Sequence, residues 1–257
     1  MLYPNVYSFI MIIQKNNSQL FVQDITMSKL GRSRTTRILL PKAYYKFPEK
    51  KFPVMYLMDG QNLFDQNTAY FKPWNLQKVM DNLPLKDQVI LVGIDNGGHY
   101  RGSEYMPHNH KKYNGEGELF LDFLINELKP KVDQHLRTLQ DRENTIIAGS
   151  SLGGLISFYA ATRHSDVFGK AGVMSPAFWI YPPIFNINPT QFSKIYVMGS
   201  KSESRGMQAT LEKTYWTLKK HNYPSENYRV VIKERGRHSE VMWGQQFGNM
   251  VKWLMNS

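Results

Sequence analysis

The sequence contains no cysteine among its 257 residues. This absence excludes disulfide bonds, thiolate nucleophiles and zinc sites built on thiolates. Any nucleophilic chemistry must therefore use another side chain.

Long apolar runs are absent as well. No stretch approaches the roughly 20 apolar residues that a membrane-spanning helix needs, so we expect no membrane insertion. The apolar N-terminal stretch lacks the basic start and the small-residue cleavage site of a secretory signal, and we interpret residues 5–13 as a first strand. Together with the lack of cysteine, these features predict a cytoplasmic protein.

Acidic residues are few relative to basic ones: 21 Asp and Glu against 32 Lys and Arg give a formal net charge of +11. An excess of this size raises nucleic acid or a membrane surface as a partner. The densest basic segment, residues 29–51, is spread over an edge-like strand and a proline-containing loop. We therefore expect a solvated basic face there and no nucleic-acid partner.

The order of hydrophobic patterns predicts an α/β fold. A β-rich start, residues 5–40, precedes alternating strands and helices over residues 53–257. This order is typical of a mostly parallel central sheet with antiparallel N-terminal strands and helices on both faces. We expect a single domain over residues 1–257, with its catalytic core in 53–257. The expected strands are 5–13, 19–26, 33–40, 53–58, 88–94, 144–148, 169–174, 194–198 and 227–233, and the expected helices are 74–83, 116–137, 155–164, 206–221 and 240–255.

Residues 145–155 read Thr-Ile-Ile-Ala-Gly-Ser-Ser-Leu-Gly-Gly-Leu. A β-branched run leads into Gly149-Ser150-Ser151-Leu152-Gly153, and a helical pattern follows at once. Strand, G-x-S-x-G and helix in this order form the nucleophile elbow of α/β-hydrolases, where a strained turn exposes the serine hydroxyl. The flanking residues are small because a Cβ there would collide with the neighbouring strand or helix. Ser151 is therefore the candidate nucleophile, and an ordinary glycine-rich turn is the alternative.

A serine hydroxyl needs a base, which in this fold follows it in the chain. Three histidines lie beyond Ser151. His164 closes the helix that the serine opens, and His221 reads as a helix C-terminus. His238 follows a β-patterned run, on a loop where the base of such an enzyme sits. We predict that His238 is the general base; a surface-loop histidine is the alternative.

The acid partner is expected in the loop after residues 194–198, where Glu203 is the only carboxylate. It would hold the imidazole tautomer and stabilise the imidazolium. Two alternatives stay open. In the first, Glu203 merely caps or approaches the N-terminus of the following helix. In the second, Ser151 and His238 act as a dyad.

An acyl-transfer intermediate also needs N–H donors for its oxyanion. One donor is the backbone N–H of Leu152, directly after the nucleophile. The second is expected after a central strand, where Asp59-Gly60-Gln61-Asn62 follows residues 54–58. Gly60 lets the backbone approach closely, and we assign the N–H of Gln61 as the donor. On residue chemistry alone, this segment fits any tight turn.

Taken together, these segments resemble the putative esterase family of α/β-hydrolases. That family includes ferric-enterobactin esterase-like hydrolases and the acetyl and feruloyl esterases of carbohydrate esterase family 1. The matching segments are Tyr56 to Asp65, Val92-Gly93-Ile94, Arg101 with Glu104-Tyr105, Gly149 to Gly154, Ser175-Pro176-Ala177-Phe178-Trp179, and Gly236 to His238 with Trp243.

The resemblance runs from about residue 33 to the C-terminus. It implies an α/β-hydrolase fold, Ser151 as nucleophile, His238 as base, and oxyanion donors at Gln61 and Leu152. In one respect the chain departs from the family. Members usually place the acid closer to the strand end, whereas Lys201-Ser202 precede Glu203 here.

Aromatic and histidine side chains suggest further contacts. Trp179 lies just after a strand end, where an acyl or aromatic ester group could stack; packing of its loop onto the body is the alternative. The turn-rich connection over residues 97–117 is long enough to wall a site. Its His99, His108 and His110 do not match a zinc pattern, so we expect no metal site.

The residues thus predict a serine carboxylic-ester hydrolase that forms an acyl-enzyme on a small acyl, carbohydrate or aryl ester and needs no cofactor. Three alternatives are left: an acyltransferase on the same fold, a non-catalytic hydrolase-fold binding protein, and a basic nucleic-acid binder. The residues leave the natural ester and the oligomeric state open.

Overall fold

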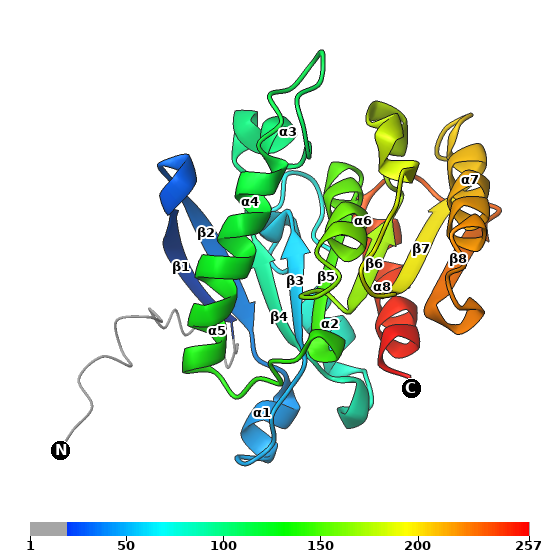
Figure 1. Ribbon diagram of the computed structural model, residues 1–257. Helices are drawn as coiled ribbons and strands as arrows, with labels where there is room; N and C mark the ends of the chain where they lie inside the picture. The colour runs from blue at the N-terminus through cyan, green and yellow to red at the C-terminus, as the bar shows by residue number, and fades with distance from the viewer. Residues whose placement is uncertain (1–19, 257) are drawn as a thin grey trace.

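The computed structural model describes residues 20–256, and the predicted strand at 5–13 lies outside this range. Its strands are β1 (Leu20–Met27), β2 (Arg32–Leu39), β3 (Val54–Met58), β4 (Ile90–Ile94), β5 (Thr145–Ser150), β6 (Lys170–Met174), β7 (Lys194–Ser200) and β8 (Tyr228–Lys233). They form one sheet in the order β1-β2-β4-β3-β5-β6-β7-β8 (Figure 1). β2 pairs antiparallel with β1 and β4, whereas all the other pairs are parallel. The predicted fold class is confirmed.

The helices are α1 (Lys42–Lys46), α2 (Leu76–Asp81), α3 (Arg101–Glu104), α4 (Gly117–Phe123), α5 (Lys129–His135), α6 (Leu152–Arg163), α7 (Met207–Lys220) and α8 (Glu240–Met255). The helix predicted at 116–137 is interrupted by a π-helical stretch, Leu124–Leu128, between α4 and α5. Pro130 follows this stretch after a single residue, Lys129. Because proline lacks an N–H and its ring clashes with the preceding turn, a local widening of the helix is the expected response.

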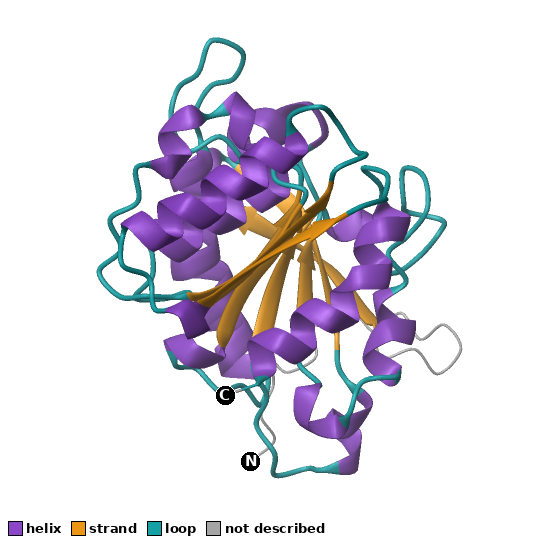
Figure 2. Ribbon diagram, turned by 90° about the vertical axis from the view of Figure 1, so that its right-hand side faces the viewer, coloured by secondary structure: helices purple, strands orange, loops and turns teal. Residues whose placement is uncertain are grey.

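Helices cover both faces of the sheet (Figure 2). Along β3, Val54, Tyr56 and Met58 enter one buried cluster, which also takes apolar residues of α4, α5, α6 and α7. The alternate residues Met55 and Leu57 enter the opposite cluster, which takes residues of α2 and α8. This alternation follows from the two-residue period of a strand. A continuous apolar run is therefore what a sheet covered on both sides requires.

The arginines of β2 are paired with acids. Arg32 contacts Glu104 at 2.9 Å and Glu116 at 2.8 Å. Arg34, which is only 8% exposed, also contacts Glu104. The expectation of a solvated basic face is therefore wrong for these side chains. Their partners come from a distant part of the chain, so the local sequence carried no sign of the pairing.

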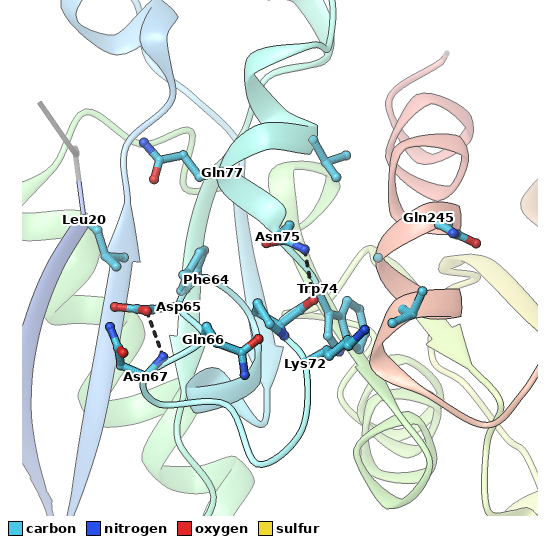
Figure 3. A pocket seen from close by; sticks show the side chains of 14 residues that line it. Leu20, Phe64, Asp65, Gln66, Asn67, Lys72, Trp74, Asn75, Gln77 and Gln245 are labelled. Carbon is cyan, nitrogen blue, oxygen red and sulfur yellow. Dashed lines mark hydrogen bonds between the residues drawn. The ribbon is translucent and has the colours of Figure 1, made fainter. Parts of the chain in front are cut away.

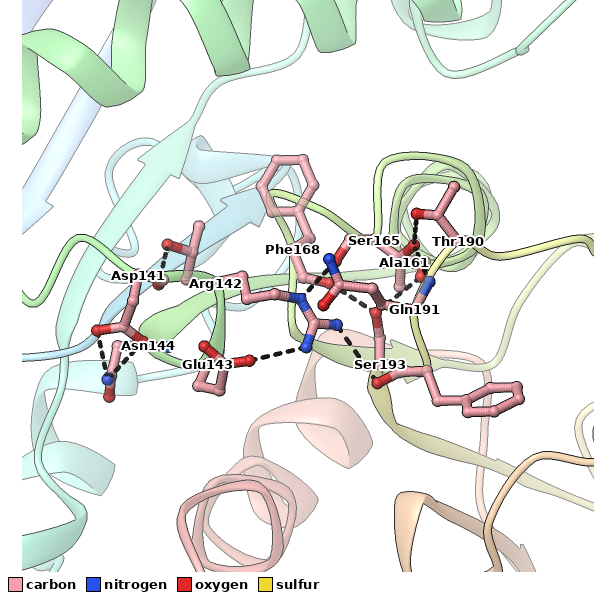
Figure 4. Close-up of polar contacts among 12 residues, drawn as sticks. Asp141, Arg142, Glu143, Asn144, Ala161, Ser165, Phe168, Thr190, Gln191 and Ser193 are labelled. Carbon is pink, nitrogen blue, oxygen red and sulfur yellow. Dashed lines mark hydrogen bonds and ion pairs between the residues drawn. The ribbon is translucent and has the colours of Figure 1, made fainter.

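The start of β5 is fixed by a polar cluster around Arg142 (Figure 4). The Asp141 carboxylate accepts a hydrogen bond from the Asn144 N–H at 3.1 Å. The Arg142 side chain donates to the Ser165 carbonyl at 2.6 Å, and its own carbonyl accepts from the Gly169 N–H at 2.8 Å. These contacts hold the amino end of β5 against the connection between α6 and β6.

The segments that carry the candidate site residues lie at the opposite edge of the sheet, where the parallel strands end. β3, β5, β7 and β8 run parallel, so the segments that follow them leave from the same edge. These segments carry Gly60 and Gln61, Ser151, Glu203 and His238. In open α/β sheets, ligands bind at the carboxyl ends of the strands.

Between residues 20 and 256, no helix is both long and apolar enough to cross a bilayer. The cytoplasmic location stays a prediction.

Candidate active site

Ser151 sits in a backbone conformation that a side chain rarely adopts. Its φ is 57° and its ψ is −121°, at the junction of β5 and α6. Such values cost free energy in a non-glycine residue and persist only where the surroundings impose them. Here the Ser151 N–H donates to the Met174 carbonyl at 3.0 Å, and its carbonyl accepts from Leu155 and Ala177, each at 3.0 Å. Strain of this kind is expected at a nucleophile elbow.

The small residues around Ser151 are sterically required. A Cβ on Gly149 would lie 2.6 Å from the backbone of Gly153. A Cβ on Gly153 would lie 2.8 Å from the Met58 Cβ. Neither neighbour can move freely, because Gly153 belongs to the backbone of α6 and Met58 is buried at the end of the adjacent strand β3. The strand-turn-helix therefore closes only with glycine at these two positions.

Glu203 and His238 are in direct contact. The His238 Nδ1 lies 2.9 Å from one carboxylate oxygen of Glu203. The other oxygen accepts a hydrogen bond from the Ser200 N–H at 2.6 Å. The Glu203 side chain is 1% exposed, while that of His238 is 35% exposed. A buried carboxylate thus orients a histidine that still reaches the surface.

The turn that carries Glu203 is tied to the loop that carries His238. Ser202 Oγ donates to the Gly236 carbonyl at 2.8 Å and accepts from the Gly236 N–H at 2.9 Å. The Lys201 N–H donates to the Lys233 carbonyl at 2.9 Å. The two residues that separate Glu203 from the strand end therefore clamp the turn and do not displace the carboxylate.

Ser151 and His238 line one cavity of about 680 Å³. Its apolar wall consists of Tyr70, Phe71, Trp74, Val241 and Trp243. Within residues 20–256, no hydrogen bond joins the Ser151 hydroxyl to His238. A contact of this kind is often long without substrate and tightens when substrate binds.

The two assigned oxyanion donors flank this cavity without lining it. Gln61 lies in the 3-10 turn Gly60–Asn62, whose first donor is the Asn62 N–H, at 2.9 Å from the Asp59 carbonyl. The N–H of Gln61 precedes that donor and is not used within the turn. Leu152 is the first residue of α6, where backbone N–H groups have no partner inside the helix. Asp59, Asn62 and Ser151, their chain neighbours, all line the cavity.

Gly60 is needed for a close backbone approach. A Cβ at this position would lie 2.7 Å from the Gly93 carbonyl carbon and 2.8 Å from the Ile94 backbone nitrogen. The Gln61 side chain then caps the end of β4 by accepting from the Asn96 N–H at 3.0 Å. The turn is thereby pressed onto β4 and held there.

Sequence reasoning missed an ion pair in the cavity wall. Arg101 donates to both oxygens of Asp59, at 2.6 and 2.9 Å, and the Asn96 side chain donates to Asp59 at 2.7 Å. Burial opposes the charge on Arg101, but Asp59 outweighs it and raises the pKa of that guanidinium. Asp59 itself adopts a left-handed conformation with φ of 59°. Because 42 residues separate the two partners, no local sequence pattern indicates the pair.

Trp179 lies apart from these residues. It is 54% exposed, in the 3-10 turn Phe178–Ile180, and is not among the residues lining the cavity with Ser151. Its role in substrate binding stays a prediction. Trp74 and Trp243 instead supply tryptophan surface to the cavity.

A second cavity, of about 870 Å³, adjoins the first (Figure 3). The two share Lys72, Trp74 and Val241. Amide side chains surround much of the second one: Gln66, Asn67, Asn75, Gln77 and Gln245. The shared residues therefore stand between the two cavities.

The histidines of the long connection do not converge. His108 Nε2 lies 3.1 Å from the Tyr159 hydroxyl, which also donates to Glu118. Burial and Glu118 raise the pKa of Tyr159. In the part of the chain that the structure describes, no group of three or more His, Asp or Glu side chains is placed to hold a metal ion.

Known proteins resemble this chain in sequence and in fold. A family model described as "Putative esterase" matches residues 27–254. The chain belongs to this esterase family. The resemblance drawn from the sequence is confirmed.

Individual proteins that resemble this chain share no more than a quarter of its residues over the aligned length in the three examples that follow. The uncharacterized protein YbbA of Bacillus subtilis is 25% identical over 244 residues, which cover 88% of this chain and 94% of YbbA. An endo-1,4-beta-xylanase/feruloyl esterase of Xylanibacter ruminicola is 25% identical over 247 residues, covering 91% of this chain and 31% of that longer protein. The enterobactin esterase of Shigella flexneri superposes with a TM-score of 0.71 at 19% identity, covering 94% of this chain and 59% of that one. The last comparison establishes a shared fold.

Proposed function

We propose that this esterase-family chain is a serine carboxylic-ester hydrolase. Ser151 is the nucleophile, His238 the general base, and Glu203 the residue that orients the base. The observation that carries the proposal is the 2.9 Å contact between His238 and Glu203, beside a strained Ser151 that lines the same cavity as His238. Membership in an esterase family supports ester hydrolysis as the reaction class.

The contact supports Nε2 as the imidazole nitrogen that takes part in the chemistry. With Nδ1 directed at Glu203, the Nε2 of His238 is left to take the proton of Ser151. The serine oxygen then bonds to the ester carbonyl carbon, and the carbonyl oxygen becomes an oxyanion. The backbone N–H groups of Gln61 and Leu152 stabilise that charge.

Breakdown of the tetrahedral intermediate completes the first half-reaction. The bond to the alcohol oxygen breaks, and His238 donates its proton to the leaving alcohol. Water, activated by the same histidine, attacks the acyl-enzyme and releases the acid and free Ser151. Besides the ester and water, these steps use only groups of the chain itself.

The cavity supports a small-molecule ester as substrate. Its volume of about 680 Å³ lies in the range of small-ligand sites, and its wall combines apolar side chains with polar and charged ones such as Asp59, Arg101 and His238. Short-chain, acetyl-sugar, feruloyl and siderophore-lactone esters all have the bond that this arrangement would cleave. The xylanase/feruloyl esterase relative makes hydroxycinnamate esters a natural first set of substrates to test.

The test is hydrolysis of p-nitrophenyl acetate, butyrate and octanoate by the wild type and by Ser151→Ala. We expect turnover by the wild type and a loss of roughly 10⁴-fold or more in the variant, because a triad without its nucleophile retains little rate. Equal turnover by both proteins would contradict the proposal. Including an alcohol acceptor in the assay separates hydrolysis from acyl transfer, since transfer would divert the acyl group from water.

A further inference from the structure

Trp243 packs against the proposed base. Its ring centroid lies 4.9 Å from that of His238, and the two ring planes meet at 88°. Trp243 is 5% exposed and comes from the first turns of α8, directly after the loop that carries the histidine. The single hydrogen bond to Glu203 leaves the imidazole free to pivot about that contact. A large ring packed edge to face against it removes this freedom.

Trp243 is itself fixed by a buried hydrogen bond. Its indole Nε1–H donates to the Ser175 hydroxyl at 2.9 Å. Ser175 is fully buried, has a φ of 44°, and its N–H donates to the Met198 carbonyl at 2.6 Å. A buried donor without a partner is costly, so the indole ring is held where this hydroxyl lies.

The residues on either side of Ser175 hold the backbone of the proposed nucleophile. The Met174 carbonyl accepts from the Ser151 N–H, and the Ala177 N–H donates to the Ser151 carbonyl, each at 3.0 Å. One short segment therefore contacts Ser151 through its backbone and Trp243 through a side chain. The hydrogen bond between Trp243 and Ser175 connects the support of the nucleophile to the support of the base.

We propose that Trp243 and Ser175 are positioning residues that set the imidazole of His238 relative to Ser151. The inference rests on the proposed function, because it assigns a role to the same two catalytic groups. Neither residue needs to take part in proton transfer. Their effect is on the fraction of time that Nε2 faces the serine hydroxyl, and hence on the rate of the chemical step.

A double-mutant cycle tests this link. Trp243→Phe keeps an aromatic ring but removes the N–H, and Ser175→Ala removes the acceptor. We expect each variant to lower kcat for p-nitrophenyl acetate by about three- to tenfold, the effect of one net hydrogen bond. The double variant should lose no more than the larger single loss, because both changes break the same contact. KM for this small ester should change by less than about twofold in Ser175→Ala, which does not line the cavity.

The matched control is Trp253→Phe, the same substitution on the same helix. Trp253 packs against Tyr196, at a ring distance of 5.8 Å, and does not line the cavity. It should leave kcat unchanged. Rates are normalised to the concentration of serine that reacts with a fluorophosphonate, so that unfolded protein does not count.

Two results would overturn the assignment. Losses in kcat that multiply in the double variant would show that the two residues act separately. A lower melting temperature with unchanged kcat per reactive serine would assign the hydrogen bond to stability alone. Failure of the proposed function gives a different pattern, since the wild type itself would then neither hydrolyse the ester nor react with the fluorophosphonate.

Discussion

At the scale of single residues, the position of Glu203 depends on a turn and not on its distance from the strand end. The carboxylate curls back to accept from the Ser200 N–H while it contacts His238. Because Ser202 is bonded to Gly236, the turn and the histidine loop move together. The wider spacing between Glu203 and the strand end is thereby accommodated.

We predict that Glu203→Gln lowers kcat on the order of 10³- to 10⁴-fold. An amide that presents its N–H₂ to Nδ1 would favour the imidazole tautomer with the proton on Nε2, which cannot accept the serine proton. Steady-state kinetics with p-nitrophenyl acetate measures the effect. Glu234→Gln is the control, because Glu234 is a nearby exposed carboxylate that forms an ion pair with Lys201. An unchanged kcat in Glu203→Gln would assign the acid role elsewhere.

Local sequence was sufficient to predict the strained turn at Ser151 and its glycines, because such a turn is built from contiguous residues whose sterics are local. The cavity wall was not predictable in the same way. Trp74 and Trp243 belong to segments far apart in the chain, and only the closed sheet brings their rings to 5.7 Å. Arg101 and Asp59 were hidden for the same reason.

At the scale of elements, the turn after β3 is held by charge. The side chain of Asp59 is 7% exposed and that of its partner Arg101 26%. Asp59 lies two residues before the proposed donor Gln61. The strands and helices of this region were predicted to within a few residues, because apolar runs of strand length alternate with helical patterns. The short helices α1 and α3 were not predicted. Nor was the π-helical stretch before Pro130, which depends on how a proline is accommodated inside a long helix.

We predict that Arg101→Met lowers the free energy of unfolding by about 3–5 kcal/mol, because it leaves the buried Asp59 carboxylate without its counter-charge. Since the turn that carries Gln61 begins at Asp59, kcat should fall as well. Thermal or urea unfolding and steady-state kinetics provide the two readouts. Lys29→Met, which breaks an exposed pair with Asp122, is the matched control and should cost less than about 1 kcal/mol. Equal losses in the two variants would contradict this account.

The loop after the same turn supplies exposed aromatic surface. Tyr70 and Phe71 are 62% and 77% exposed and line the cavity with Ser151. The Tyr70 N–H is held by the Asn62 side chain at 3.1 Å, and the Phe71 carbonyl by Gln66 at 2.7 Å. The rings are thus presented by a structured loop.

We predict that Phe71→Ala raises KM for p-nitrophenyl octanoate by about tenfold, the effect of losing part of one apolar contact, with little change for the acetate. The longer acyl chain reaches the rim, whereas acetate stays close to Ser151. Trp216→Ala is the control, because Trp216 is 61% exposed on α7 and outside the cavity. A KM shift of equal size for both esters would contradict the predicted position of the acyl chain.

At the scale of the whole molecule, the net charge of +11 does not produce the free basic face that the sequence suggested for residues 29–51. Arg32 and Arg34 pair with Glu104, and Arg37 pairs with Asp95 at 2.7 Å. Much of the densest basic segment therefore neutralises acids of the same chain. The pattern of charges alone could not separate a paired segment from a free one.

We predict weak, purely electrostatic retention on duplex DNA. Binding without a built groove relies on counterion release and falls steeply with salt. Fluorescence anisotropy with a labelled duplex, measured at about 50 and about 200 mM salt, should show binding lost at the higher concentration. Tight binding at both concentrations would contradict the absence of a nucleic-acid partner.

The central claim is that Ser151 is an activated nucleophile. The most direct measurement is covalent labelling by a fluorophosphonate, with the modified residue located by mass spectrometry of peptides. We predict a single adduct on Ser151, and a labelling rate that falls by several orders of magnitude in His238→Ala, because the hydroxyl then lacks its base. No adduct on Ser151, or a rate unaffected by the loss of His238, would contradict the account.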